Sequence, residues 1–190
     1  MTETLESIAQ AMVAPGKGIL AADESSGTIK KRFDAIKVES TEENRRDYRE
    51  LLFRTEEAMK NHISGVILYD ETIRQKAKDG TPLVDLIKKA GSIPGIKVDA
   101  GAKPMPGFLG ETVTEGLDGL RERLAEYYDL GAFPWKMSFS YGRALQAAPQ
   151  KAWAGKPENV PAAQQAFLHR AKMNGLAALG DWESKLEKAA

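Results

Sequence analysis

Apolar residues along this chain follow two different spacings, and their alternation predicts a series of strand–helix units. Short apolar runs that end in polar residues are typical of buried strands, and four of them occur, at Gly18–Gly27, Ile63–Asp70, Pro94–Gly101 and Lys136–Tyr141. Elsewhere the apolar residues recur at helical spacing, which predicts helices over Thr4–Val13, Ser40 to about Lys60, Pro82–Ala90, about Leu117–Leu130, Arg143–Trp153 and Asn159–Leu179.

Several local signals refine this pattern. Ser40 and Glu43 have the spacing of a capping box, so we expect the second helix to begin there. Pro149 is expected to interrupt the helix that contains it, because proline removes a backbone donor. Glycine and proline are frequent over 101–110, which predicts a loop.

The order of these elements predicts the fold class. Strands that alternate with helices favour an α/β fold with a parallel sheet. With 190 residues, the chain is long enough to bury a core and short enough to form one domain, 1–190.

Composition excludes several classes of function. The 27 Lys and Arg balance the 27 Asp and Glu, so no net charge favours nucleic acid or an acidic membrane surface. No apolar run is long enough to span a membrane, and we expect no signal peptide. The chain has no cysteine and therefore no disulfide. These features are compatible with a location in the cytoplasm. His62 and His169 have no ligand spacing, so no metal site and no cofactor are expected.

Three predicted strands carry an aspartate at or just past their carboxyl end, namely Asp23, Asp70 and Asp99. Parallel strands end on one rim, where α/β folds place their sites. Each aspartate can instead cap the next turn or helix, and both interpretations stay open here.

The stretch 134–145 is a second candidate for a site. It predicts a strand that leads through Gly142 into a helix beginning with Arg143. The first turn of such a helix has unpaired N–H groups that attract an anion, and an arginine adds donors suited to phosphate. The alternative is that Arg143 pairs with a neighbouring carboxylate.

Longer motifs resemble those of class I fructose-1,6-bisphosphate aldolase, the metal-independent Schiff-base family. They are Gly18–Gly27 (GILAADESSG), Ser40–Arg46 (STEENRR), Gly65–Thr72 (GVILYDET), Ile96–Asp99 (IKVD) with Gly101, Glu111–Thr112, Gly116–Leu120 (GLDGL) and Ser138–Gln146 (SFSYGRALQ). The resemblance implies a (β/α)8 barrel. It also assigns Asp23 as the catalytic aspartate, Ser25, Thr28 and Arg32 to the second substrate phosphate, and Ser140, Gly142 and Arg143 to the first.

The same resemblance implies that part of the barrel is missing. The segment 1–131 is similar to the first part of the family, and 132–190 begins with the family's eighth strand. Strands four to seven, with the Schiff-base lysine, the acid/base glutamate and half of the first phosphate site, have no counterpart. Ala100 stands where the family has an active-site lysine. This direct join favours an engineered or otherwise truncated chain as a hypothesis of origin.

Loss of aldol cleavage is the expected consequence. The reaction needs a lysine whose amine is neutral enough to attack a ketone. Of the lysines on or near strands, Lys97 and Lys136 should lie low on their strands and Lys103 in a solvated loop. Residual weak aldolase activity, or a phosphate-binding α/β module, are the alternatives.

The remaining strands predict an all-parallel sheet in the order 4-1-2-3, which is half of a barrel with two open edges. Closure as a homodimer or higher homo-oligomer would restore eight strands. The polar inner face, which includes Asp23 and Ser140, favours this over a flattened, doubly wound Rossmann-like sheet covered by helices. We expect Leu109, Phe133 and Met137 to build core near the join. Apart from itself, the expected partners are phosphate or sulfate.

Overall fold

A computed structural model describes residues 4–116, 118–130, 140–179 and 181–188 of the chain, and the fold below is that of these residues. Its helices are α1 (Leu5–Met12), α2 (Ser26–Ala35), α3 (Glu42–Phe53), α4 (Glu56–His62), α5 (Asp70–Arg74), α6 (Leu83–Lys89), α7 (Leu120–Asp129), α8 (Arg143–Trp153) and α9 (Val160–Leu179), with short 3-10 turns at Pro157–Asn159 and Ser184–Lys188. Its strands are β1 (Gly18–Ala22), β2 (Ile63–Leu68), β3 (Ile93–Ile96), β4 (Gly101–Pro104), β5 (Thr112–Glu115) and β6 (Ser140–Tyr141). None of these helices is both long and apolar enough to cross a membrane.

The central sheet has four strands in the order β3-β2-β1-β6, and every neighbouring pair is parallel. This confirms the predicted strand order. Most of the predicted fourth strand lies outside the described residues, and its described end pairs with β1 through Ile19–Ser140 and Leu20–Tyr141. The third strand ends at Ile96, five residues earlier than predicted.

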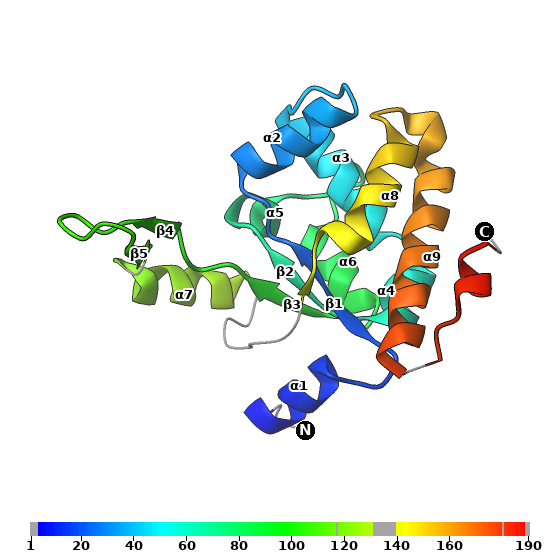
Figure 1. Ribbon diagram of the computed structural model, residues 1–190, viewed down its shortest axis with the longest axis horizontal. Helices are drawn as coiled ribbons and strands as arrows, with labels where there is room; N and C mark the ends of the chain where they lie inside the picture. The colour runs from blue at the N-terminus through cyan, green and yellow to red at the C-terminus, as the bar shows by residue number, and fades with distance from the viewer. Residues whose placement is uncertain (1–3, 117, 131–139, 180, 189–190) are drawn as a thin grey trace.

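The main core lies on one face of this sheet. Leu20 and Ala22 of β1 point into a cluster with buried residues of α2, α3, α6, α8 and α9. Figure 1 shows these helices gathered on one side of the sheet, with α1 standing apart from them. Burial of this cluster supplies the main driving force for folding.

The alternate residues of β1 belong to a second, smaller cluster. Ile19 packs with Ile8 and Met12 of α1, on the face of the strand opposite Leu20. Gly65 of β2 permits this close approach, because a Cβ there would lie 2.6 Å from the Met12 Cε. A single short helix therefore covers part of this second face of the sheet.

Three predictions about helices are wrong in detail. The N-cap of α3 is Thr41 rather than Ser40, since the Thr41 Oγ1 accepts the Asn44 N–H at 3.1 Å. The helix predicted to reach Lys60 is broken into α3 and α4 around Thr55, whose hydroxyl donates to the Leu51 carbonyl at 3.0 Å. Pro149 does not interrupt α8, because the helix continues to Trp153 while Pro149 is buried among its tertiary contacts.

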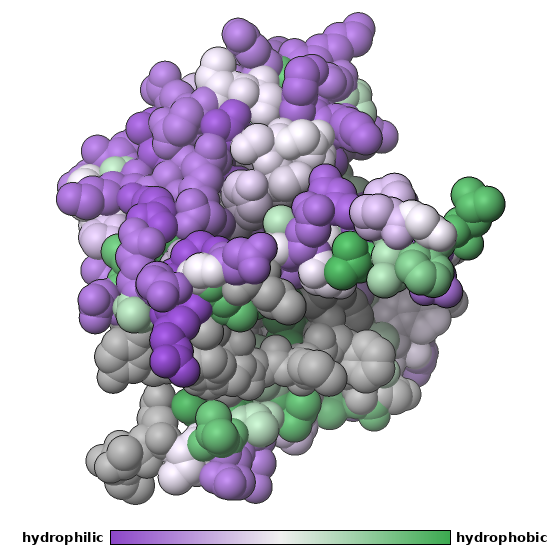
Figure 2. Space-filling model, turned by 90° about the vertical axis from the view of Figure 1, so that its left-hand side faces the viewer, coloured by the Kyte–Doolittle hydropathy of each residue, from purple (hydrophilic) through white to green (hydrophobic). Residues whose placement is uncertain are grey.

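The predicted loop over 101–110 is in fact part of an antiparallel hairpin. Strands β4 and β5 pair from Gly101–Glu115 to Pro104–Thr112, and the hairpin projects with α7 away from the body of the molecule (Figure 1). Leu109, which we expected in the core, is fully exposed near its tip, so that prediction is wrong. Phe133 and Met137 lie outside the described residues. Figure 2 looks from the hairpin side and shows hydrophobic groups mainly in the middle and lower part of this face.

Candidate active-site rim

The carboxyl ends of β1 and β6 lie side by side and form the centre of the candidate site. The register that pairs Leu20 with Tyr141 brings Gly142 beside Ala21, and a Cβ on Gly142 would lie 3.7 Å from the Ala21 Cβ. Asp23 follows β1 directly, and Arg143 follows Gly142. The sheet therefore places two of the predicted groups, from opposite ends of the chain, on one rim.

The turn from β6 into α8 passes through Gly142, which precedes the first helical residue, Arg143. The Gly142 carbonyl accepts the N–H groups of Leu145 and Gln146 at 3.2 Å each, which starts the helix. Arg143 is exposed on its first turn, and within the described residues no hydrogen bond or ion pair holds its guanidinium. The neighbouring-carboxylate alternative therefore receives no support from these residues. Ser140 contributes its backbone to β6.

The start of α2 supplies two further predicted residues. Ser25 is the N-cap and accepts the Thr28 N–H at 3.4 Å. The hydroxyls of Ser25 and Thr28 lie 3.1 Å apart, and Thr28 is exposed. Each hydroxyl has one donor and two acceptor sites, so the pair keeps hydrogen-bonding capacity for a polar ligand. Their assignment to a phosphate stays a prediction.

Arg32, by contrast, is engaged inside the protein. It pairs with the carboxylate of Glu24, and its Nη1 also donates to the Gln146 Oε1 at 3.3 Å. Gln146 is 1% exposed and donates from Nε2 to the Glu24 Oε1 at 2.6 Å. Burial raises the pKa of Glu24, and the charge of Arg32 opposes that shift.

Sequence reasoning missed this cluster of Glu24, Gln146 and the buried Tyr48, whose hydroxyl lies 3.4 Å from the Gln146 carbonyl oxygen. The available signal was the position of two polar residues beside predicted site residues, Glu24 after Asp23 and Gln146 one turn after Arg143. Burial of both could not be read from the spacing alone.

The three strand-end aspartates have different environments. No hydrogen bond or ion pair engages Asp23 within the described part of the chain, and the residue is half-buried. Asp70 begins α5, and hydrogen bonds from Arg74 and then from Tyr127 lower its pKa against the effect of burial. Asp99 lies three residues past β3 and binds Lys97 at 2.7 Å. Asp70 and Asp99 are thus occupied by local contacts, while Asp23 is the open one.

The candidate lysines do not form a nucleophile site. Lys97 follows the end of β3 rather than lying low on that strand, which corrects our expectation, because the strand is shorter than predicted. Its amine is held by Asp99. Lys103 is exposed on β4, Ala100 is exposed at the family's lysine position, and Lys136 lies outside the described residues.

Comparison with known proteins places this chain in a family. The family model "Fructose-bisphosphate aldolase class-I" matches residues 4–133 and 132–190, so its two matching segments meet at 132–133. A probable fructose-bisphosphate aldolase class 1 of Xanthomonas campestris is 63% identical over 145 residues, which are 75% of this chain and 43% of that relative. The chain thus spans less than half the length of this relative.

Two further relatives match nearly the whole chain. Fructose-bisphosphate aldolase of Echinococcus multilocularis is 33% identical over 332 aligned positions that cover 96% of this chain and 92% of the relative. The solved aldolase of Plasmodium falciparum, crystallised in complex with TRAP and a small-molecule inhibitor, superposes with a TM-score of 0.86 at 28% identity, covering 94% of each chain. The chain therefore belongs to the class I fructose-bisphosphate aldolase family.

Proposed function

We propose that this chain is a family member that lacks the central part of the barrel, does not cleave fructose bisphosphate, and keeps a phosphate-binding rim. The observation that carries the proposal is the exposed Arg143 beside the Gly142 turn, next to the carboxyl end of β1. Phosphate binding there can use the backbone donors of the turn and the guanidinium, which form the half of the first phosphate site that this chain retains.

The alignments support the absence of the central strands. The 332 aligned positions shared with the Echinococcus relative exceed the 190 residues of this chain, so a large part of that relative has no counterpart here. The family model is matched in two segments that meet at 132–133, where the sequence analysis placed the join. In the family this missing part carries the Schiff-base lysine.

Loss of aldol cleavage follows from the lysines that remain. A Schiff base forms only when an unprotonated amine can attack the substrate carbonyl. Lys97 is occupied by its ion pair with Asp99, and Lys103 is solvated on the projecting hairpin. Asp23 alone cannot replace the nucleophile, although it keeps its place on the rim.

Borohydride trapping with dihydroxyacetone phosphate tests the loss of activity. We expect no covalent adduct by mass spectrometry, and an adduct on any lysine would show instead that weak aldolase activity survives. Backbone NMR shifts during titration with inorganic phosphate test the rim. We expect shifts at Gly142 and Arg143 that disappear in Arg143→Ala but persist in Arg121→Ala, which removes an exposed arginine from α7. Equal shifts in both variants would contradict the proposal that phosphate binds at the rim.

We also propose that the protein self-associates to close its sheet. Within the described residues β3 pairs only with β2 and β6 only with β1, so the outer edge of each is open. Open edges of a parallel sheet favour pairing with another copy. Light scattering should give a mass of at least twice 20.8 kDa. A monomer mass would favour the flattened, rearranged sheet.

A further inference from the structure

The first turn of α8 is attached to the central sheet by few backbone contacts. Within the described residues, β6 consists of Ser140 and Tyr141, which pair with two residues of β1. Gly142 follows directly as the N-cap of α8, and it has no side chain that could make a capping hydrogen bond. In this part of the chain, the position of the turn is therefore fixed largely by the side chains of α8 that contact neighbouring elements.

The buried residue Gln146 makes the polar part of this attachment. Its backbone N–H donates to the Gly142 carbonyl at 3.2 Å, so it belongs to the first turn itself. Its Nε2 donates both to the Ala21 carbonyl of β1 and to the Glu24 Oε1, the latter at 2.6 Å. Ala21 is also the residue beside Gly142 in the sheet. One side chain thus joins the turn to the carboxyl end of β1.

The oxygen of the same amide is held by two donors from other helices. The Gln146 Oε1 accepts from the Arg32 Nη1 of α2 at 3.3 Å and from the Tyr48 hydroxyl of α3 at 3.4 Å. An amide has two N–H donors and two acceptor positions, and here each of them has a partner. Acceptors surround the nitrogen and donors surround the oxygen, so the amide is fixed in one orientation.

This attachment positions the donors of the proposed phosphate-binding rim. The N–H groups of Arg143 and Ala144 have no carbonyl partner within α8, because they belong to its first turn. An anion at the rim contacts these N–H groups and the guanidinium together, so its affinity depends on how firmly the turn is held before binding. Gln146 is 1% exposed and its side-chain bonds are all used, so it acts on the anion only through the turn.

We propose that Gln146 is a positioning residue for phosphate, a role that rests on the phosphate-binding rim proposed above. Its amide holds the Gly142–Arg143 turn against β1, so that the backbone donors and the guanidinium are in place when the anion arrives. Without the amide, Leu145 in the main core and the short β6 pairing keep α8 on the sheet. The first turn is then free to move relative to β1, and binding must order it.

NMR titration of the full chain with inorganic phosphate at neutral pH tests this role in Gln146→Met, which keeps the side-chain length but has no donor. The dissociation constant measured at the Gly142 and Arg143 amides should rise at least about fivefold. Heteronuclear NOE values of these two amides without phosphate should decrease, which a general loss of stability in a folded protein would not produce. Gln146→Asn, whose amide is one carbon shorter, is the second variant and should weaken binding by a smaller factor. Circular dichroism should show that both variants fold.

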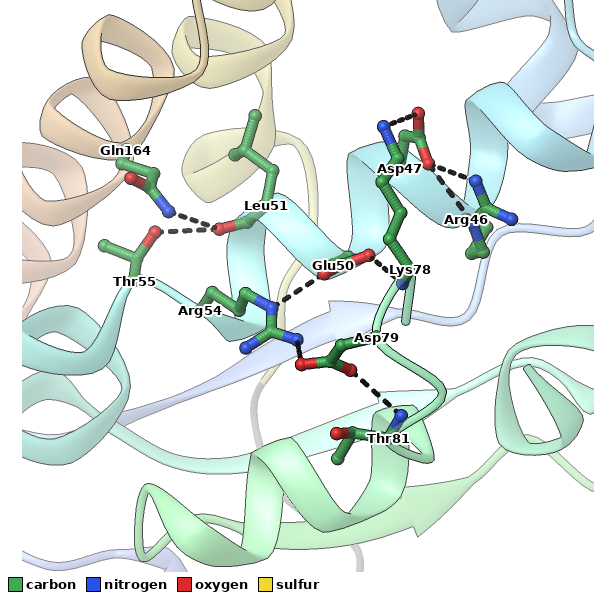
Figure 3. Close-up of polar contacts among 10 residues, drawn as sticks. All are labelled: Arg46, Asp47, Glu50, Leu51, Arg54, Thr55, Lys78, Asp79, Thr81 and Gln164. Atoms are coloured by element: carbon green, nitrogen blue, oxygen red, sulfur yellow. Dashed lines mark hydrogen bonds and ion pairs between the residues drawn. The ribbon is translucent and has the colours of Figure 1, made fainter. Parts of the chain in front are cut away.

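Gln164 provides a matched control at the other end of α8. Its Nε2 donates to the Leu51 carbonyl at 3.4 Å and so links α9 to α3 (Figure 3). It lines the same pocket as Trp153, the last residue of α8. Gln164→Met removes an amide contact between helices away from the rim, and it should change the affinity for phosphate less than about twofold.

The outcomes separate this role from the rim on which it rests. Unchanged affinity and NOE values in Gln146→Met, with phosphate still binding to the wild type, would overturn only the positioning role. Equal losses of affinity in Gln146→Met and Gln164→Met would overturn it as well, because any weakened helix contact would then suffice. The absence of phosphate-dependent shifts in the wild type would overturn both proposals.

Discussion

Gln146 donates a hydrogen bond from its Nε2 to the Glu24 Oε1 at 2.6 Å, although the two residues are 122 positions apart in the chain. Glu24 belongs to the first of the two segments that match the family, and Gln146 to the second. The same amide nitrogen also donates to the Ala21 carbonyl of β1. These buried hydrogen bonds thus link α8 to the carboxyl end of β1.

Replacing Gln146 with alanine should therefore destabilise the protein by about 2 kcal/mol, because it removes the buried donor that the Ala21 carbonyl and the Glu24 carboxylate share, and leaves Glu24 with Arg32 as its partner. Urea denaturation followed by circular dichroism measures the change. Gln165→Ala, at an exposed position of α9, is the control and should change stability by less than about 0.5 kcal/mol. A similar small effect at both positions would show that the link contributes nothing net.

Glu71 neutralises the charge of a buried arginine, so its removal should destabilise the protein more than the removal of Gln146. It forms ion pairs with Arg45 and with Arg49, whose side chain is 2% exposed. Glu71→Gln leaves the Arg49 charge buried without its carboxylate, and we expect a loss of about 3 kcal/mol in the free energy of unfolding. Glu111→Gln, on the exposed hairpin, should have no comparable effect. Stability retained within about 1 kcal/mol would contradict this assignment.

The same carboxylate predicts part of the acid dependence of stability. Burial would raise the pKa of Glu71, but hydrogen bonds from Arg45 and Arg49 outweigh it and lower the pKa from 4.5. A lowered folded-state pKa stabilises the protein above the unfolded value, and this contribution is lost as pH falls through the folded value. Wild type should thus lose more stability than Glu71→Gln below about pH 4.5. Parallel acid profiles would argue against the ion pairs.

His62 should make the stability of the protein depend on pH in a higher pH range than Glu71 does. Burial, followed by the charge of Lys172, lowers the pKa of His62 from 6.5. Because the folded protein binds this proton more weakly than the unfolded chain, stability should decrease as pH falls from about 6.5 toward the folded-state pKa. His62→Gln removes the titration and should flatten this part of a thermal-unfolding profile. His169→Gln is the control, and equal flattening in that variant would assign the dependence elsewhere.

Sequence reasoning predicted the order and direction of the central strands because βα units and family motifs are local patterns. It failed at Leu109, where an apolar side chain projects at a hairpin tip, since exposure depends on what packs nearby. The prediction that Pro149 interrupts its helix failed because tertiary packing stabilises α8 although proline lacks one backbone hydrogen bond. The family motifs allowed the rim residues to be predicted from the sequence. The Glu24–Gln146 contact could not be predicted in this way, because it depends on the register between β1 and β6.

The exposed position of Leu109 gives the last prediction. Leu109→Asp should change the free energy of unfolding by less than about 0.5 kcal/mol, because the side chain is fully exposed and no buried contact is lost. Leu20→Ala, at a position of β1 that is 0% exposed, should by contrast cost about 2–5 kcal/mol. Denaturation at low protein concentration, where self-association is weak, separates the two effects. If Leu109→Asp proved as damaging as Leu20→Ala there, the hairpin would have to pack against the body of the same chain, and the projecting arm in Figure 1 would not be its state in solution.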